Sequence, residues 1–340
     1  MKTDLTEQIT GRARELGIAL CGIVRADVMD GYAERVRERI ANIPDGESAF
    51  GWAERGNMRR TMPWAKSVVA VALDISRYRV PPALDGLVGK HFLFDFRSCP
   101  ESREATQVAA LGEYLASLGL RTESNNVLGL RWAAVSAGLG VFRRNNFFYG
   151  ANGSRYWLWA WATDAETESV RETSAKPCPD GCDLCRRACP TGSLSAPYTM
   201  SMLTCVEHLT ASGVRLAPDD PQNAQTGAWL YGCDACQDAC PFNAKPFGTD
   251  EYPGLSELEE FLKPQWILSA TYDELREKFS RKFHYIGADN LWKWKVTALN
   301  VLANDWQPQY AAAVRAALGD EHEAVREKAA YVARKYGETI

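Results

Sequence analysis

The sequence predicts a chain of three parts: a mixed α/β domain, a cysteine-rich region and a helical C-terminal region. Segments with helical and strand-like patterns alternate up to about residue 165, which is typical of an α/β domain. Eight of the ten cysteines then lie between residues 178 and 240. After Pro253, apolar residues recur at helical spacing. We therefore expect domains over residues 1–172, 173–250 and 251–340.

The elements of the first domain follow from the spacing of its apolar side chains. Leu5, Ile9 and Ala13 share one face of a helix that begins at Asp4. The expected elements are, in order, a helix over 4–16, strands over 18–24 and 67–73, an irregular stretch over 81–100, helices over 101–118 and 131–137, and a strand over 156–163. In the C-terminal region, two helical hairpins of the HEAT type fit residues 292–336.

The composition is that of an ordinary globular protein. Of the 340 residues, 46% are apolar and 24% are charged, and the net charge is −4, so no overall positive charge draws the chain to nucleic acid. No run approaches the roughly 20 apolar residues of a membrane span, and residues 1–5 lack the features of a secretory signal. We expect a cytoplasmic protein, in which clustered cysteines are more often metal ligands than disulfides.

The clustered cysteines lie in two stretches, and each stretch contains a Cys-x2-Cys pair followed by Cys-x3-Cys-Pro spacing. The first holds Cys178, Cys182, Cys185 and Cys189, and the second holds Cys205, Cys233, Cys236 and Cys240. An iron–sulfur cube needs four thiolates, of which one loop with short spacings can supply three. The pattern therefore predicts two [4Fe–4S] clusters. Cys21 and Cys99 lie outside it.

The fourth ligand of each cluster is expected to come from the other stretch. In two-cluster ferredoxins, the cysteine before proline crosses to the other cluster, and such cysteines here are Cys189 and Cys240. The predicted ligands are Cys178, Cys182, Cys185 and Cys240 for cluster one, and Cys189, Cys205, Cys233 and Cys236 for cluster two. Two zinc sites are the alternative, since Cys-x2-Cys pairs also bind zinc, but the doubled Cys-x3-Cys-Pro runs favour iron.

Four further segments have distinctive sequences: Gly51-Trp52-Ala53-Glu54-Arg55, Pro63-Trp64-Ala65-Lys66-Ser67, Ala137-Gly138-Leu139-Gly140 with Arg144-Asn145-Asn146, and Tyr231-Gly232-Cys233-Asp234-Ala235-Cys236 with Cys240-Pro241-Phe242-Asn243. Together they resemble epoxyqueuosine reductases and their relatives, a cobalamin-dependent family with a double [4Fe–4S] domain that is related to reductive dehalogenases. The resemblance implies a first domain that binds base-off cobalamin, a ferredoxin-like second domain, and electrons from an external low-potential donor such as flavodoxin or ferredoxin. It implies a cobalamin-dependent reductase.

The same resemblance suggests individual site residues. The proposed proton donors are Glu123 and, by analogy with dehalogenase tyrosines, Tyr149. The residues expected to contact cobalamin are Ser124, Asn125, Leu139, Gly140, Arg144, Asn145, Asn146 and His208. Each has a plainer interpretation as a surface, turn or packing residue.

Two departures from the family pattern leave the substrate open. The family's aspartate, within a Val-Asp-Ser-Ala-Pro-like run, has no match, because an ungapped count reaches Ser124 and a shift of one residue reaches Glu123. Gly89-Lys90-His91-Phe92 stands in place of an Asp-Tyr-His run. The substrate is therefore either a tRNA-borne epoxide or a small organic molecule such as a halide. The alternative functions are an iron–sulfur electron carrier or corrinoid-activating protein and a reductive dehalogenase-like enzyme.

Overall fold

The first domain is built on a four-stranded sheet that is antiparallel throughout. The computed structural model describes residues 2–41, 43, 58–124, 129–167 and 173–337. In spatial order the strands are β1 (Leu20–Arg25), β2 (Ser67–Asp74), β6 (Tyr156–Thr163) and β3 (Thr122–Glu123). Val69 lies opposite both Ile23 and Trp161, which fixes the register of the three long strands. Helices and strands are mixed as expected, but the sheet is not the parallel sheet of a doubly wound α/β domain.

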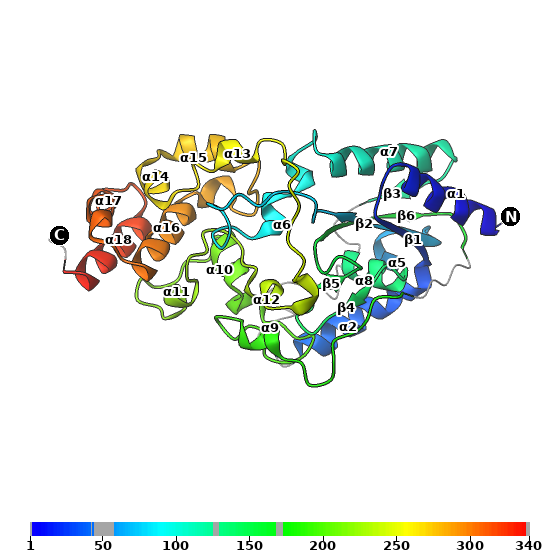
Figure 1. Cartoon of the computed structure of the whole chain (residues 1–340), viewed down its shortest axis with the longest axis horizontal. Coiled ribbons are helices and arrows are strands. Elements are labelled where there is room, and N and C mark those ends of the chain that lie inside the picture. Colours follow the sequence, from blue (N-terminus) through cyan, green and yellow to red (C-terminus); the bar gives the residue numbers. More distant parts are fainter. Residues whose placement is uncertain (1, 42, 44–57, 125–128, 168–172, 338–340) are drawn as a thin grey trace.

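Helices cover both faces of this sheet (Figure 1). On one face lie α1 (Lys2–Glu15) and α7 (Arg103–Ser117), which pack against Trp161 and its neighbours. The elements of the other face and its rim are η1 (Ala26–Asp30), α2 (Gly31–Ile40), α5 (Met58–Thr61), α8 (Leu130–Ser136), β4 (Val141–Phe142) and β5 (Phe148–Tyr149). Alternation along β6 sends Trp157 and Trp159 to the α7 side, and Leu158 and Ala160 to the α8 side.

The cysteine-rich region consists of loops and short helices at the centre of the elongated molecule (Figure 1). Its elements are α9 (Leu184–Arg187), η3 (Met202–Thr204), α10 (Val206–Ala211), α11 (Gln222–Gln225), α12 (Ala235–Asp238) and η4 (Pro241–Asn243). Between β2 and α7, the segment with α6 (Lys90–Leu93) and η2 (Phe96–Ser98) runs beside this region, because Val88 pairs with Tyr231. The three parts of the chain therefore share packed surfaces.

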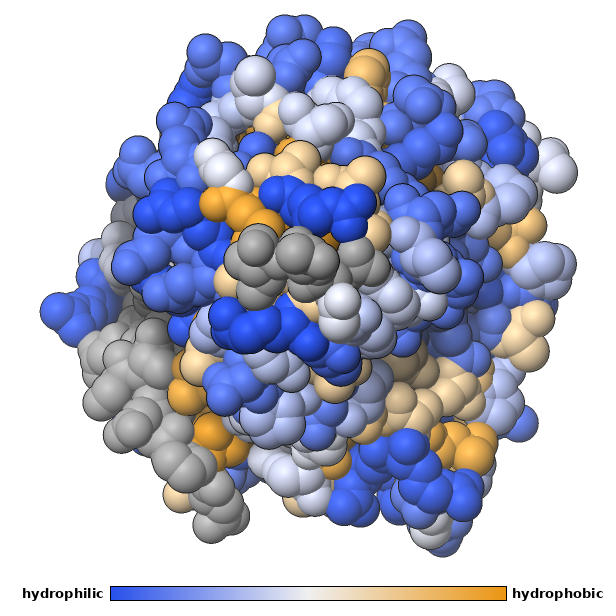
Figure 2. Space-filling model, turned by 90° about the vertical axis from the view of Figure 1, so that its left-hand side faces the viewer, coloured by the Kyte–Doolittle hydropathy of each residue, from blue (hydrophilic) through white to orange (hydrophobic). Residues whose placement is uncertain are grey.

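The C-terminal region is helical, as predicted. Its elements are α13 (Leu255–Leu258), α14 (Pro264–Ser269), α15 (Tyr272–Phe279), η5 (Ala288–Asn290), α16 (Trp292–Asn304), η6 (Pro308–Tyr310), α17 (Ala311–Ala317) and α18 (Glu323–Lys335). The core around Trp294 also contains Val88, Leu93 and Phe94 from the predicted irregular stretch. Figure 2 shows the C-terminal end of the molecule, where hydrophobic residues form small, separate groups among hydrophilic ones. The HEAT-like classification and the domain limits stay predictions.

Most predicted elements of the first domain are found within one to three residues of their expected ends. The predicted strand 156–163 coincides with β6, and the helix predicted over 131–137 is α8, after which Gly138 adopts a positive φ of 72°. The helix α2 was missed, because only Val36 is buried along it. In the described part of the chain, no helix is long and apolar enough to cross a membrane.

Candidate functional site

The eight clustered cysteines lie in two sets of four, and all are free thiols. Set one is Cys178, Cys182, Cys185 and Cys240, and set two is Cys189, Cys205, Cys233 and Cys236. Burial raises the pKa of Cys185, and the charges of its three set-one partners add to this. Burial likewise raises the pKa of Cys236, together with the charges of its three set-two partners. Each set draws one cysteine from the other stretch of sequence.

The two sets have the membership that the interleaved assignment requires, although the ligand roles themselves stay a prediction. Where thiolates are crowded together their charges repel one another, and bound iron would supply the positive charge that makes four thiolates stable together. Among the described residues, no three His, Cys, Asp or Glu side chains are grouped to hold a single metal ion. Thiolates around one zinc ion lie about 4 Å apart, whereas an iron–sulfur cube has its ligands at separate corners.

Backbone amides point at several of these sulfurs. The N–H of Ala235 donates to Cys233 Sγ at 3.5 Å, and the N–H of Arg144 donates to Cys178 Sγ at 3.4 Å. The first turn of α10 directs the amides of Glu207 and His208 at Cys205, which lowers a thiol pKa that burial raises to about 11. Hydrogen bonds to sulfur tune the reduction potential of a bound cluster.

Two arginines after β4 hold the loop of set one. The Arg143 side chain, 3% exposed, donates to the carbonyl oxygens of Lys176 and Pro177. Its guanidinium carbon lies 3.2 Å from the ring centroid of Phe242. Arg144 donates from Nη1 to the carbonyl oxygen of Cys182 at 2.9 Å. Arg144 was predicted to contact cobalamin, but its side chain contacts the cysteine loop, because the β4–β5 turn aims it there.

Asn145 and Tyr149 form a buried link between the sheet domain and both cysteine sets. Asn145 Nδ2 donates to the Tyr149 hydroxyl at 2.9 Å, and Asn243 Nδ2 donates to the same oxygen at 3.4 Å. Burial raises the pKa of Tyr149, as does the neighbouring thiol of Cys240. Asn145 Nδ2 also lies 3.5 Å from the carbonyl oxygen of Cys236. This network couples β5 to the cysteine loops.

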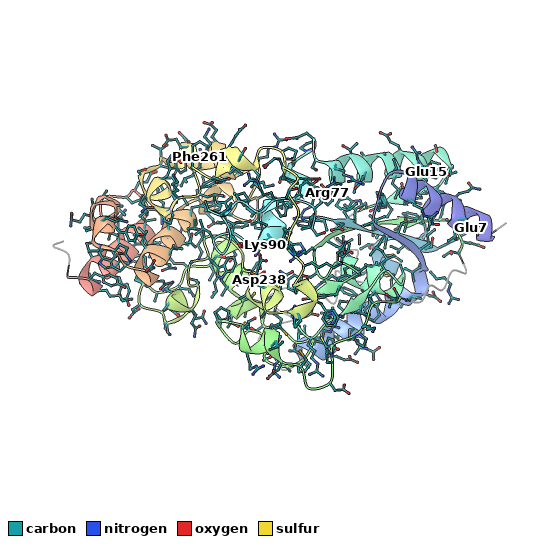
Figure 3. The ribbon with its side chains drawn as sticks, in the orientation of Figure 1. Glu7, Glu15, Arg77, Lys90, Asp238 and Phe261 are labelled. Carbon is teal, nitrogen blue, oxygen red and sulfur yellow. The ribbon has the colours of Figure 1, made fainter. Side chains whose placement is uncertain are left out.

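Lys90 links α6 to the loop of set two. Its ammonium lies 3.5 Å from the Asp234 carboxylate and 3.1 Å from that of Asp238, and its backbone N–H donates to Asp234 at 2.7 Å. Lys90 and Asp238 face one another between α6 and α12 (Figure 3). Burial raises the pKa of Asp234 to about 6, although Lys90 opposes the shift. Asp234 stands between two predicted ligands, Cys233 and Cys236.

A cavity of about 380 Å³ adjoins the cysteine region. Its lining is mainly aromatic and cationic: Tyr32, Arg35, Val36, Arg39, Ile40, His91, Gly129, Leu130, Arg131, Trp132, Phe142, Asn146, Phe147, Phe148, Ser154, Tyr156, Trp157, Leu158 and Met200. Ser154 donates from its hydroxyl to Gln237 Oε1 at 2.7 Å, so one wall residue contacts the segment between Cys236 and Cys240 directly. The cavity and the cysteine sets thus share a wall.

The predicted site residues are only partly brought together at this cavity. Asn146 lines it. Tyr149 does not, because its hydroxyl faces Cys240, and it is 1% exposed. Glu123 is exposed on the edge strand β3, and Ser124 donates its hydroxyl proton to the Ala160 carbonyl. Neither of these two residues lines the cavity.

The other predicted cobalamin contacts lie elsewhere. Leu139 is buried in the sheet core, and Gly140 allows the carbonyl of Tyr149 to approach where a side chain would collide. His208 contributes its backbone amide to Cys205, while burial and the charge of Lys293 lower the pKa of its imidazole. Asn125 lies outside the described residues.

The sequence reasoning missed most of the cavity residues, and three of them bear most directly on its chemistry. Arg39 comes from α2, Arg131 from α8 and His91 from α6. The His91 imidazole lies 3.2 Å from the Tyr156 carbonyl oxygen, and burial lowers its pKa. Because these three residues are far apart in the sequence, no local pattern links them. The arginines of α2, a helix that also carries apolar residues, could have marked it as a binding element.

The fold and the paired cysteine sets define a class: proteins that carry a double iron–sulfur cluster domain on a mixed helix-and-sheet domain. Residues 178–243 match the protein family described as a 4Fe-4S double cluster binding domain. This match confirms the prediction of iron–sulfur clusters.

Comparison of the whole chain identifies its relatives. It is 28% identical over 300 residues to the epoxyqueuosine reductase of Gloeobacter violaceus, covering 81% of this chain and 87% of that protein. It is 26% identical over 292 residues to the enzyme of Leadbetterella byssophila, covering 81% and 92%. The resemblance to the epoxyqueuosine reductase-like family is thereby confirmed, and those relatives are oxidoreductases.

Solved structures agree on the fold. A crystal structure of epoxyqueuosine reductase with an epoxyqueuosine-modified tRNA-Tyr stem loop superposes with a TM-score of 0.82 at 23% identity, covering 99% of this chain and 92% of that one. The structure of the enzyme from Streptococcus thermophilus gives 0.76 at 21% identity, covering 99% and 100%. At such identities the likeness establishes the fold.

Proposed function

We propose that this chain is an oxidoreductase of the epoxyqueuosine reductase type, in which two [4Fe–4S] clusters pass electrons from an external donor to cobalamin bound at the cavity. The main support for this proposal is that the cavity and the cysteine sets share a wall. Asn146 lines the cavity, while the adjacent Asn145 hydrogen-bonds towards both cysteine sets through Tyr149 and Cys236. An electron leaving a cluster would therefore cross only a few side chains to reach a bound molecule.

The cavity residues fit cobalamin in character. Aromatic and aliphatic side chains suit the faces of a flat macrocycle, and amide and cationic groups suit its polar edges. Arg39 Nε is buried without a hydrogen-bond partner among the described residues, so the wall holds an unused donor. The volume of about 380 Å³ lies at the lower end of the range for small-molecule sites, so the described residues would enclose only part of a molecule as large as cobalamin. Bound cobalamin would supply a reducing centre, and the protein would supply position and electrostatics.

The residues of the chain would prepare the site in two ways. Apolar walls such as Phe147 and Leu158 exclude water, which strengthens electrostatic interactions within the cavity. Arg143 and Arg144 place positive charge beside set one, which favours the reduced state of a cluster there. For the proton, Glu123 and Tyr149 remain candidates, but His91 is the titratable side chain that borders both the cavity and α12.

The substrate is proposed from the relatives and not from the cavity alone. Their enzymes are named for epoxyqueuosine, and one structure carries the modified tRNA stem loop. We propose a tRNA-borne epoxide as the first substrate to test and a small organic molecule, such as a halide, as the second.

Anaerobic reconstitution with iron, sulfide and hydroxocobalamin tests the cofactor proposal. We expect about eight iron atoms per chain and one corrin that co-purifies, visible in the absorption spectrum. The variant Met200→Trp, which narrows the cavity without touching a cysteine, should lose corrin and keep iron. Full iron without corrin in the wild-type protein would instead indicate an electron carrier.

A second experiment tests the substrate and the proton donor. The reduced, cobalamin-loaded protein is incubated with epoxyqueuosine-modified tRNA, and queuosine is measured in the RNA. Loss of turnover in Glu123→Gln would support an acid role for Glu123, and unchanged turnover would exclude it. His91→Gln is the matched comparison, because this residue lines the cavity.

A further inference from the structure

Two arginines from different helices meet at one residue of the cavity wall. Arg39 Nη1 of α2 donates to Asn146 Oδ1 at 2.5 Å, and Arg131 Nη1 of α8 donates to the Asn146 backbone oxygen. Asn146 has a positive φ of 66°, a conformation that asparagine tolerates better than most residues. The side-chain oxygen and the backbone oxygen of Asn146 thus each accept from one arginine. Both guanidinium groups are held at the wall of the same cavity.

Within the described part of the chain, acidic groups do not match the positive charge at this wall. None of the described residues that line the cavity is an aspartate or glutamate. The nearby Glu38 is bonded to Arg35 at 2.6 Å. Arg39 Nε has no hydrogen-bond partner in the described structure, although it is buried. Burial, followed by the charges of Arg131 and Arg35, lowers the pKa of Arg39 to about 10.

The surroundings of the pair make such a charge costly. The guanidinium carbon of Arg39 lies 4.7 Å from the ring centroid of Phe142, and Trp132 and Leu130 continue the apolar wall. Burial also lowers the pKa of Arg131. Two like charges kept together in an apolar cavity are destabilising unless an opposite charge joins them. The guanidinium donors match the geometry of carboxylate and phosphate oxygens.

We propose that Arg39 and Arg131 bind one oxyanion, a phosphodiester or a carboxylate, against the aromatic wall of the cavity. The oxyanion accepts from Arg39 Nε and from the guanidinium donors that Asn146 leaves free. Two sources share this chemistry. One is the phosphodiester of the nucleotide arm of cobalamin, and this source rests on the proposed function. The other is an anionic group of the substrate.

The test uses the fully reconstituted two-cluster chain and the variants Arg39→Met and Arg131→Met. Arg37→Met is the matched control, since Arg37 is exposed on the same helix and does not line the cavity. Without corrinoid, calorimetric titration with inorganic phosphate and with benzoate measures the anion site. We expect each cavity variant to weaken anion binding by about ten- to hundredfold, as for a lost charged hydrogen bond, and Arg37→Met to leave it unchanged.

A second titration distinguishes the sources. Cobinamide lacks the nucleotide arm and its phosphodiester, so the absorption-based affinities of cobalamin and cobinamide are compared. If the arginines hold the cofactor, the wild-type chain prefers cobalamin by about tenfold or more, and Arg131→Met abolishes the preference. If they hold the substrate, both corrinoids bind equally, and benzoate still binds to the corrinoid-loaded chain.

The outcomes separate this inference from the proposed function. Anion affinity and corrinoid preference that are the same in Arg39→Met, Arg131→Met and the wild type would overturn the oxyanion site, even if cobalamin binds. Anion binding that depends on the arginines, in a chain that binds no corrinoid, would uphold the oxyanion site and contradict the cobalamin proposal.

Discussion

The two cysteine sets each consist of four thiols but lie in different surroundings. Set one is contacted by Arg143 and Arg144 from the sheet domain. Set two lies against α10 and the Lys90–Asp234 pair, where burial raises the pKa of Cys233 to about 12. A cluster in set one would therefore experience nearby positive charge, and one in set two would lie in a drier environment.

This difference suggests a direction for electron flow. Positive charge stabilises a reduced cluster and raises its potential, whereas burial away from water disfavours the added negative charge. Cluster two should have the lower potential and cluster one the higher. Electrons would then move from cluster two to cluster one and on to the cavity that borders the sheet domain. The proposed difference between the two sets can be tested by substitutions at each set separately.

The largest effect is expected at set two, from Lys90→Met. The substitution leaves the Asp234 carboxylate, 3% exposed, without its cation. Removing one partner of a buried ion pair destabilises a protein by about 3–5 kcal/mol. Thermal unfolding of the reconstituted protein, followed by circular dichroism, measures the loss. Asp238→Asn is the control, because Asp238 is half exposed and should cost less than about 1 kcal/mol. Equal losses in both variants would contradict the role of Asp234.

A smaller and more selective effect is expected at set one, from Arg143→Met. The variant loses two hydrogen bonds to carbonyl oxygens and the contact with Phe242, which together cost about 2–3 kcal/mol. It should also lower the potential of cluster one by roughly 50–150 mV, because a charge is removed beside it. Redox titration followed by electron paramagnetic resonance measures both clusters. The control is Arg187→Met, an exposed residue of the same loop. A change in the reduction potential of cluster two alone would contradict the proposed difference between the two sets.

The smallest effect concerns the helical region behind set two. Lys293 and Lys328 are buried and donate to the carbonyl oxygens of Val214 and Pro218. Burial lowers the pKa of each to about 8. Between pH 8 and about 10.4 the unfolded chain binds more protons than the folded one, so stability should rise with pH.

The expected rise is about 1–2 kcal/mol for each lysine, and the double variant Lys293→Met/Lys328→Met should lack it. Unfolding midpoints between pH 7.5 and 10 provide the measurement, with the exposed Lys263→Met as control. A rise that persists in the double variant would show that other groups cause it.

The features that the sequence predicted well are those with a local cause. Alternation along 156–163 depends only on which side of a strand each residue faces, and it predicted β6 correctly. Cysteine spacing reports how one loop can surround a cluster. Such signals need no knowledge of distant parts of the chain.

The features that it missed depend on contacts between distant segments. Arg39 and Arg131 meet only because α2 and α8 are brought to the same wall. Arg144 was recognised as a binding residue, but its direction depends on the turn between β4 and β5. The apolar residues of the stretch 81–100, such as Phe94, join the C-terminal core through tertiary packing that no local pattern reports.

The crossing of Cys189 and Cys240 is tested most directly by counting iron in two double variants after anaerobic reconstitution. In Cys189→Ala/Cys233→Ala both removed thiols belong to set two, so about four iron atoms per chain should remain. In Cys185→Ala/Cys189→Ala the removed thiols are neighbours in sequence but belong to different sets, so both clusters should be lost. Retention of about four iron atoms in the second variant would contradict the interleaved arrangement.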